Sequence, residues 1–395
     1  MSSNADVVVI GGGVVGTSTA FHLAKAGAGE VVLLERRFLG AGASGKSGAV
    51  VRMHYSNPYD ASLAQQSLPY FQHWGDYVGY GESGYVKLGM ARLITAGQEE
   101  PLRANVEMLR GCGVNTWLMT PAEFADRYPH ANLDGVPLVC WEEEAGYADP
   151  NGTVQGLAEA AKALGAEIRL NTPALSIRTE NGRVTGVETP GGAIETSAVV
   201  VAAGAYANGL INPLGIDYGL RPNRVQVAIF RRPFEHREQH PIFIDGKNAM
   251  WIRPEGPHST LAGYDYDLFG ANPDFYNESI DWEFLVECRR RLADRLPFMQ
   301  ETPMRGGWAG VITNSPDGHA VIEQTPGYDG LFLALGDSGT NFKTAPMIGK
   351  CLAEWIVDGA PASVDVTVFR GSRFAEGTPI PGGVAYGSGP TSVFH

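Results

Sequence analysis

The segment 6–35 carries an apolar run, a turn rich in glycine, a run of mixed polarity and a second apolar run. The apolar runs span residues 7–10 and 31–34, and such short runs bounded by turn signals are typical of strands buried on both faces. The mixed run predicts a helix over residues 13–27, which ends where further glycines follow. The order strand, helix, strand therefore predicts a parallel βαβ unit.

The glycine turn follows the pattern G-x-G-x-x-G, with Gly11, Gly13 and Gly16 at its three glycine positions. Gly11 permits a tight turn, Gly13 lets the backbone approach a pyrophosphate, and Gly16 lets the helix pack closely on the strand. The N-terminus of that helix then offers unpaired N–H groups to phosphates. Glu35 follows the second apolar run, where a carboxylate accepts hydrogen bonds from ribose hydroxyls. These features predict a dinucleotide site rather than a glycine-rich surface turn.

The pattern changes twice beyond this unit, which indicates a second domain inserted into the first. Two aromatic-rich stretches, 56–149 and 221–304, interrupt segments that return to alanine- and glycine-rich strand, turn and helix patterns. We therefore expect an α/β plus α+β protein, with further helices at about 61–75, 152–164 and 281–295. The expected division is a discontinuous nucleotide-binding domain of residues 1–55, 150–220 and 305–370, a substrate domain of residues 56–149 and 221–304, and a Gly/Pro-rich tail of residues 371–395.

Composition narrows the possible partners and the compartment. The chain has 395 residues, 44% of them hydrophobic, and a net charge of −13, which disfavours nucleic acid and anionic membranes as partners. Its four cysteines are widely spaced and form no CxxC pair, so we expect free thiols and no metal site. The N-terminal residues do not resemble a signal peptide, and no apolar run is long enough to cross a bilayer, so a cytoplasmic location is expected.

The loop 40–48, which follows Glu35, contains almost no large side chain. Such a loop can lie directly against a flat ligand, and the alternative interpretation is a flexible linker. Its position after the expected ribose-binding carboxylate favours the ligand.

Several later segments resemble flavoproteins. Residues 199–205 resemble the second nucleotide-contacting strand of the glutathione-reductase plan, and 331–346 resemble the C-terminal flavin segment of the D-amino-acid-oxidase superfamily. Residues 52–62 are similar to sarcosine oxidase β subunits, and 251–254 and 314–318 also fit the branch of sarcosine oxidase and glycine oxidase. The resemblance implies FAD as the cofactor. It also implies a glutathione-reductase-type Rossmann domain with a second, antiparallel-sheet substrate domain.

The resemblance further implies that a small amino acid, N-methylated, secondary or D-configured, is oxidised to an imine by hydride transfer to flavin. Arg52 matches the arginine that pairs with the substrate carboxylate, and Lys343 matches a second cation at the flavin face. Trp251 matches a pocket aromatic, and His54 and Tyr55, close to Arg52 in sequence, are further candidates to face the pocket. The expected catalytic residues are Arg52, Lys343, Trp251 and His54. Each of these residues also has a structural alternative. Arg52 could form a surface ion pair, Lys343 could be an ordinary surface lysine, and Trp251 could pack in the core. His54 and Tyr55 could likewise be purely structural. Cofactor contacts are expected from Gly11, Gly13, Val14, Val15, Gly16, Glu35, Arg36, Ala43, Ser44, Ser47, Gly48, Ala174, Gly204, Gly336, Gly339, Thr340 and Lys343.

The chain also departs from the family pattern. Gly310 stands where some relatives have a flavin-linking cysteine, and residues 43–49 lack the histidine that tethers FAD in others. We therefore expect non-covalent FAD. Leu261 stands where oxidases of this branch carry a lysine that assists the reaction of reduced flavin with oxygen, while Asp265 and Ala49 replace a histidine and an arginine. These changes predict weak oxidase activity or transfer of electrons to another acceptor.

Three alternatives remain open from the sequence. The same fold could oxidise a 2-hydroxy acid, or the chain could be the flavin-bearing subunit of a hetero-oligomer with little activity alone. A homo-oligomer is a further possibility, because the sequence leaves the oligomeric state open. The identity of the amine is also open, because the pocket draws on two discontinuous segments.

Overall fold

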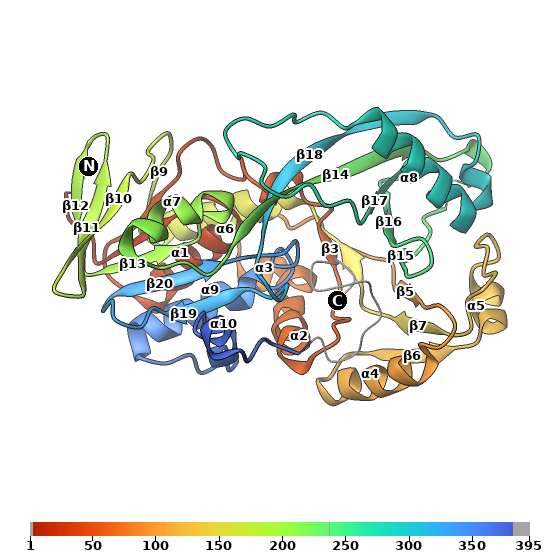
Figure 1. Ribbon diagram of the computed structural model, residues 1–395, viewed down its shortest axis with the longest axis horizontal. Coiled ribbons are helices and arrows are strands. Elements are labelled where there is room, and N and C mark those ends of the chain that lie inside the picture. The colour runs from red at the N-terminus through yellow and green to blue at the C-terminus, as the bar shows by residue number, and fades with distance from the viewer. Residues whose placement is uncertain (1–2, 237, 382–395) are drawn as a thin grey trace.

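A six-stranded sheet lies in one half of the molecule, on the left of Figure 1. The computed structural model describes residues 3–236 and 238–381. Five strands run parallel, and the edge strand β19 pairs antiparallel with β20. The strand order is β19 (Val321–Gln324), β20 (Leu331–Leu335), β13 (Ala198–Val201), β1 (Val7–Ile10), β2 (Val31–Leu34) and β9 (Glu167–Arg169).

Both faces of this sheet are covered, which explains why its central strands are continuous apolar runs. All residues of β1 and β2 are buried. The helices α1 (Val14–Ala26), α6 (Pro150–Ala163) and α9 (Ala345–Asp358) pack together with one set of these side chains. The other set packs with α7 (Ala207–Ile211) and a small sheet of β10 (Ser176–Glu180), β11 (Arg183–Thr189) and β12 (Gly192–Glu195).

An eight-stranded sheet forms the second half, on the right of Figure 1. Its neighbouring strands are antiparallel except for the parallel pair β15 and β5. One face packs against α8 (Trp282–Arg295) and α5 (Pro121–Arg127). The order is β18 (Met304–Asn314), β14 (Arg221–Arg231), β17 (Ser259–Tyr264), β16 (Met250–Glu255), β15 (Ile242–Asp245), β5 (Met90–Leu93), β7 (Val139–Glu142) and β6 (Thr116–Met119). The expected fold class, a Rossmann-type sheet with a second, largely antiparallel sheet, is confirmed.

Strand β18 runs through the expected domain boundary at residue 305. It pairs with β14 from Met304 to Asn314, so its full length belongs to the eight-stranded sheet. The chain returns to the six-stranded sheet only at β19. The division into two domains otherwise stays a prediction.

One helix begins earlier than the sequence pattern predicts, because of its capping residues. The helix expected at 61–75 is α2 (Pro58–Gln72), and the short α3 (Trp74–Tyr77) follows it. The side chain of Asn57 caps α2 by accepting hydrogen bonds from the N–H groups of Tyr59 and Asp60. Pro58 at the first helical position is compatible with this early start, because its missing N–H would have no partner there.

A small sheet and two further helices complete the described chain. The sheet consists of β3 (Val50–Val51), β8 (Gly146–Tyr147) and β4 (Val86–Lys87), with β8 between the other two strands. The helices are α4 (Glu99–Gly111) and α10 (Arg373–Glu376). In the described part of the expected tail, 371–381, the buried Arg373 forms a 2.8 Å ion pair with Asp317, while 382–395 lie outside the described residues. Among residues 3–236 and 238–381, no helix combines the length and apolar character needed to cross a bilayer.

Candidate active site

The glycine turn between β1 and α1 has no room for larger residues. Gly11 has φ +116°, and a Cβ atom added there would lie 2.3 Å from the carbonyl oxygen of Ala202. A Cβ atom on Gly16 would lie 1.9 Å from the carbonyl oxygen of Gly11. Glycine at these positions lets α1 pack directly on the turn, as the dinucleotide pattern requires. Gly13 is the N-cap of α1, so Val14 and Val15 supply the first N–H groups of the helix.

The carboxylate of Glu35 lies against the same turn. One oxygen, Oε2, accepts a hydrogen bond of 2.8 Å from the N–H of Gly12, and Oε1 accepts one of 2.7 Å from the N–H of Arg37. These bonds fix a buried carboxylate beside the glycine turn, where a ribose would lie. Arg36 is placed differently, because its side chain forms a surface ion pair of 2.8 Å with Asp274. Its expected role in cofactor binding stays a prediction.

The loop 40–48 lies over the start of α1 and against the eight-stranded sheet. Ala43 precedes the short 3-10 turn Ser44–Lys46, and Ser44 Oγ accepts a hydrogen bond of 3.0 Å from the N–H of Val14. Ser47 is used locally, because its Oγ accepts a hydrogen bond of 2.9 Å from the N–H of Ala49. Gly48 lies against the Trp251 ring, which would be 2.6 Å from an added Cβ atom.

The segment 336–343 forms a tight turn beside the end of β18. Gly336 and Gly339 have φ of +64° and +78°, a conformation that favours glycine. Asp337 shapes the turn by accepting a hydrogen bond of 3.0 Å from the N–H of Gly339, and its carbonyl accepts one of 2.9 Å from the Thr340 hydroxyl. Lys343 Nζ donates a 3.0 Å hydrogen bond to the carbonyl of Thr340.

Unpaired polar atoms next to this turn suit a heterocyclic ligand. The amide Nδ2 and Oδ1 of Asn314 are buried and have no hydrogen-bond partner among the described residues, and the same holds for Thr313 Oγ1. The carbonyl of Thr313 accepts a 2.9 Å hydrogen bond from the N–H of Ser338. Buried polar groups normally have partners, so these atoms fit a bound group with donors and acceptors of its own. Neither side chain was expected as a cofactor contact, although residues 314–318 fit the family pattern.

The two remaining expected contacts lie at strand ends of the six-stranded sheet. Ala174 follows β9 and packs against the apolar side chains that α7 covers. Gly204 follows β13, has φ +51° and opens the 3-10 turn Gly204–Tyr206. Ligands of such sheets bind at the carboxyl ends of the strands, which is where both residues lie.

Arg52 and Lys343 meet at the ring of Tyr55. The guanidinium carbon of Arg52 lies 4.7 Å and Lys343 Nζ 5.3 Å from the ring centre. Each side chain is only 5% exposed. Burial, and secondarily the charge of Arg52, lower the pKa of Lys343 well below its ordinary value. An anion bound between them would reverse this effect, since a nearby negative charge favours the charged form of lysine.

His54 lies behind these cations, in contact with the eight-stranded sheet. Its Nε2 is 3.4 Å from the amide Nδ2 of Asn105, and its Nδ1 is 3.7 Å from Cys140 Sγ. Burial, with the charges of Arg92 and Arg52, lowers the pKa of His54 well below its ordinary value. The imidazole is therefore neutral at physiological pH.

One face of the eight-stranded sheet points towards these groups. In-register neighbours share a face, and the register aligns Trp251 with Ile244, Ile244 with Arg92, and Arg92 with Cys140. Glu142 shares the face of Cys140, because side chains two residues apart in a strand point the same way. The sheet therefore presents one aromatic, one cationic and one anionic side chain towards the segment 48–55.

Three buried side chains that the structure brings to this site were not expected from the sequence as site residues. Glu142 is fully buried, and its Oε1 accepts a 2.8 Å hydrogen bond from the N–H of Met53. Asp60 and His319 form a buried pair, with 2.7 Å between Oδ2 and Nδ1. The run of three acidic residues, 142–144, reads as a solvated face, so the sequence contains no signal for the burial of its first member.

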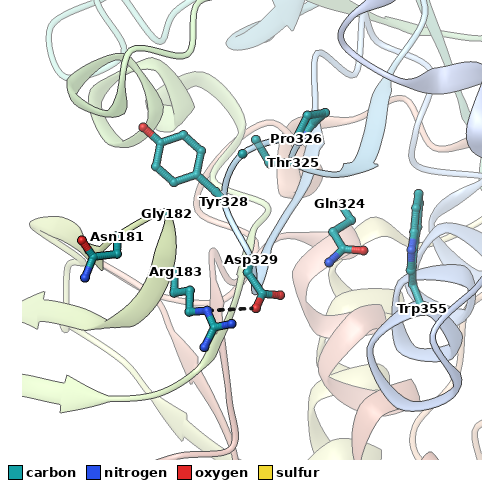
Figure 2. Close-up of a pocket in the computed structure, with 10 residues that line it drawn as sticks. Asn181, Gly182, Arg183, Gln324, Thr325, Pro326, Tyr328, Asp329 and Trp355 are labelled. Carbon is teal, nitrogen blue, oxygen red and sulfur yellow. Dashed lines mark ion pairs between the residues drawn. The ribbon is translucent and has the colours of Figure 1, made fainter.

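A shallow surface pocket of about 590 Å³ lies elsewhere (Figure 2). The β10–β11 turn, the β19–β20 turn and α9 supply its lining, which includes an exposed ion pair between Arg183 and Asp329. It shares no residue with the expected site. None of the residues that line this pocket belongs to the buried groups around Arg52 and Lys343.

Curated relatives of this chain include amine-oxidising enzymes. Human mitochondrial sarcosine dehydrogenase is 28% identical over 383 residues, which cover 91% of this chain and 40% of that protein. The 4-methylaminobutanoate oxidase (formaldehyde-forming) of Paenarthrobacter nicotinovorans is 25% identical, covering 94% of this chain and 46% of that protein. The chain therefore spans less than half the length of these two relatives.

A solved structure and a family match cover most of the chain. The L-proline dehydrogenase of P. horikoshii superposes with a TM-score of 0.89 and 27% identity, covering 96% of this chain and 100% of that one. Residues 6–355 match the family described as FAD dependent oxidoreductase, DAO. The match confirms the expected family and, with it, the expected cofactor. The chain belongs to the DAO family of FAD-dependent oxidoreductases.

Proposed function

We propose that this chain binds FAD without a covalent link and oxidises a small amino acid, N-methylated, secondary or D-configured, to an imine. The observation that carries the proposal is the pair of buried cations, Arg52 and Lys343, that share the Tyr55 ring. Two neighbouring buried cations attract an anion, since a nearby negative charge favours their charged forms. We infer that a substrate carboxylate binds beside them, in addition to the protein carboxylates of Glu142 and Asp60, whose charges already act on Lys343.

Different groups of residues would bind the pyrophosphate, the ribose and the ring system of FAD. Gly11, Gly13 and Gly16 leave the backbone open to a pyrophosphate, and the Glu35 carboxylate lies where a ribose would bind. Asn314 and the turn at 336–340 offer polar groups to the ring system. When bound, FAD supplies the hydride acceptor.

The protein's own contribution is to hold the substrate. The planar guanidinium of Arg52 can pair with a carboxylate through two parallel hydrogen bonds, and Lys343 adds a compact charge. With the carboxylate fixed at one end, the Cα–H bond of a small amino acid has few orientations left. Such positioning can supply much of the rate enhancement in a reaction that needs little covalent help.

Anaerobic bleaching of the flavin absorbance tests the proposal. Purified protein supplied with FAD is mixed with sarcosine, proline, D-amino acids and 2-hydroxy acids in separate experiments. We expect bleaching by at least one amine-bearing acid. Bleaching by hydroxy acids alone would instead support the 2-hydroxy-acid alternative, and the proposal fails if no compound bleaches the flavin.

The absence of a covalent link rests on Gly310 and its surroundings. A Cβ atom added at Gly310 would lie 3.3 Å from Lys46 Cβ, and Gly310 itself offers no nucleophile. Acid precipitation should leave the yellow flavin in the supernatant, and a yellow pellet would contradict this part of the proposal.

The oxygen reactivity rests on Leu261, which is 2% exposed on β17 and pairs in register with Arg253. Leucine offers no charge to stabilise developing superoxide. After anaerobic bleaching, admission of air should return the flavin colour slowly, whereas an artificial electron acceptor should return it fast. Rapid recovery in air would identify an oxidase.

A further inference from the structure

Glu142 is a fully buried carboxylate beside the two cations, and its two oxygens differ in their hydrogen bonds. Its Oε1 accepts the hydrogen bond from the N–H of Met53, one residue from Arg52. Its Oε2 is buried and has no hydrogen-bond partner among the described residues. A buried carboxylate oxygen without a partner is unfavourable, because water can no longer solvate it. This oxygen can therefore accept a hydrogen bond from a donor outside the protein.

The fold places Glu142 on the side of the sheet that faces the expected substrate. It shares its face with Arg92 and Trp251, and the opposite face is covered by α8. The segment 48–55 lies against the same face, since Gly48 contacts Trp251 and Met53 bonds to Glu142. Glu142 is thus held on a rigid strand next to the start of the Arg52 side chain.

The charges around Glu142 are complementary to a zwitterion. In the proposed function Arg52 and Lys343 bind the substrate carboxylate, and the charges of both lower the pKa of Glu142. An α-amino acid carries its ammonium group two bonds from its carboxylate carbon, so both ends can reach opposite charges in one site. The titratable or charged groups that face Glu142 are Arg52, Tyr55, Tyr85, Arg92, Cys140 and Lys343.

We propose that Glu142 binds the ammonium group of the amino-acid substrate and accepts its proton. The inference rests on the proposed function and assigns the base that this function needs. In the step, one N–H bond breaks and one O–H bond forms on Glu142, while the electron pair of the broken bond stays on nitrogen. The amine becomes neutral and the carboxylate becomes a carboxylic acid, so no oxidant or reductant takes part.

Environment makes Glu142 suitable for this task. Burial raises its pKa to about 7, although the hydrogen bonds from Met53 and His54 and the charge of Arg52 oppose the change. A base is most effective when its pKa lies near the working pH. The same carboxylate favours amines over 2-hydroxy acids, because a hydroxyl group brings no positive charge to Glu142.

The variant Glu142→Gln tests the proposal, with Glu143→Gln as the matched control. Glutamine keeps an oxygen for the Met53 N–H but cannot accept a proton from an ammonium group. Glu143 is the next residue and forms surface ion pairs with Lys87 and Arg127. The measurement is the rate of anaerobic flavin bleaching from pH 5 to 9, with an amino acid that bleaches the unmodified protein.

In the unmodified protein and in Glu143→Gln, the rate should fall below a midpoint near pH 7. In Glu142→Gln this limb should disappear, and the rate at pH 8 should fall by about 10² to 10⁴-fold, the usual contribution of a general base. Binding of methoxyacetate, which has a carboxylate but no ammonium group, should change less than threefold, as read from the flavin spectrum. A Glu142→Gln protein with an unchanged rate and pH profile overturns the inference.

Two further outcomes separate the inference from the proposed function. If no amino acid bleaches the unmodified protein, the proposed function itself fails. If Glu142→Gln no longer holds FAD, the inference is tested on the unmodified protein instead. The affinities for sarcosine and for methoxyacetate are then each measured as a function of pH. Loss of Glu142 ionisation should weaken sarcosine and not methoxyacetate, and equal pH dependence for both ligands contradicts the inference.

Discussion

His319 Nδ1 lies 2.7 Å from Asp60 Oδ2, and both side chains are buried. The contact ties the first turn of α2 to the loop that connects β18 with β19. Burial lowers the pKa of His319, but the charge of Asp60 and the hydrogen bond to it outweigh burial and raise it. The pKa of Asp60 is lowered, because the charge and hydrogen bond of His319 outweigh its burial. The two opposite shifts both favour the ionised pair, and the charge of Lys343 also acts on Asp60.

Removing one partner of this pair should destabilise the protein strongly. Asp60→Asn removes the counter-charge that acts most strongly on the buried imidazolium, and breaking a buried pair costs about 3 to 5 kcal/mol. Stability from the raised pKa of His319 is complete below 6.5 and is lost as the pH rises through the raised value. Stability from the lowered pKa of Asp60 is present above 3.8 and is lost as the pH falls through the lowered value.

Urea unfolding of the flavin-loaded protein checks this pair. The difference between the unmodified protein and Asp60→Asn should be largest between pH 3.8 and 6.5. Asp274→Asn, which removes an exposed ion pair with Arg36, serves as the control and should change stability by less than about 1 kcal/mol. Equal losses in both variants would show that the buried pair contributes no more than a surface one.

Gly16→Ala should abolish FAD retention. The added methyl group would meet the backbone oxygen of Gly11 at 1.9 Å, and backbone atoms cannot move aside as a flexible side chain can. Helix α1 must then shift away from the turn, which opens the pyrophosphate site. The readout is the ratio of flavin to protein absorbance after purification, which should fall at least tenfold.

Gly209→Ala is the matched control for that substitution. Gly209 lies inside α7, and nothing described lies within 4 Å of a Cβ atom added there. Alanine should retain full flavin content and stabilise the helix by up to about 1 kcal/mol. Normal flavin content in Gly16→Ala would show that close packing at the turn is not required.

Arg52→Lys should weaken substrate binding although the charge is kept. Lysine cannot form two parallel hydrogen bonds to a carboxylate, and such charged bonds contribute about 1.5 to 3 kcal/mol each. We expect KM to rise by about 10- to 100-fold in steady-state assays with an artificial acceptor. Arg183→Lys, at an exposed ion pair with Asp329, should leave KM unchanged. An unchanged KM in Arg52→Lys would remove Arg52 from substrate binding.

The nucleotide-binding part of the fold could be predicted because its signals are local. The glycines, the apolar strands and Glu35 lie within one βαβ unit, and each acts through neighbours close in sequence. The early start of α2 was missed although its signal is also local, because Asn57 and Pro58 stand outside the expected helical run. Boundaries depend on single capping residues, whereas element type depends on a whole segment.

The buried polar groups could not be predicted, since their partners lie far away in sequence. Glu142 bonds to Met53 across 89 positions, and His319, in the loop between β18 and β19, contacts Asp60 of α2 across a still longer stretch of the chain. Nothing in the run 142–144 distinguishes its buried member from the two that reach solvent. Side chains along β7 alternate between the two faces of the sheet, and this alternation places Glu142 on the inner face. Which face is inner is known only when the neighbouring strands and their register are known.

Glu142 should make the protein less stable at high pH than at low pH, which separates its electrostatics from any activity. Its pKa is raised from 4.5 to about 7, so the folded protein binds the proton more tightly than the unfolded chain does. Stability therefore falls as the pH rises from 4.5 to about 7, and the full penalty, about 3 kcal/mol, remains above that range.

The variant Glu142→Gln has no ionisable group at this position, so it should be more stable than the unmodified protein at pH 8 and similar to it at pH 5. Urea unfolding of the flavin-loaded proteins at both pH values measures this difference, with Glu143→Gln as the control. A Glu142→Gln protein that is less stable at pH 8 would show that its ionised carboxylate is stabilised by its neighbours and not strained by burial.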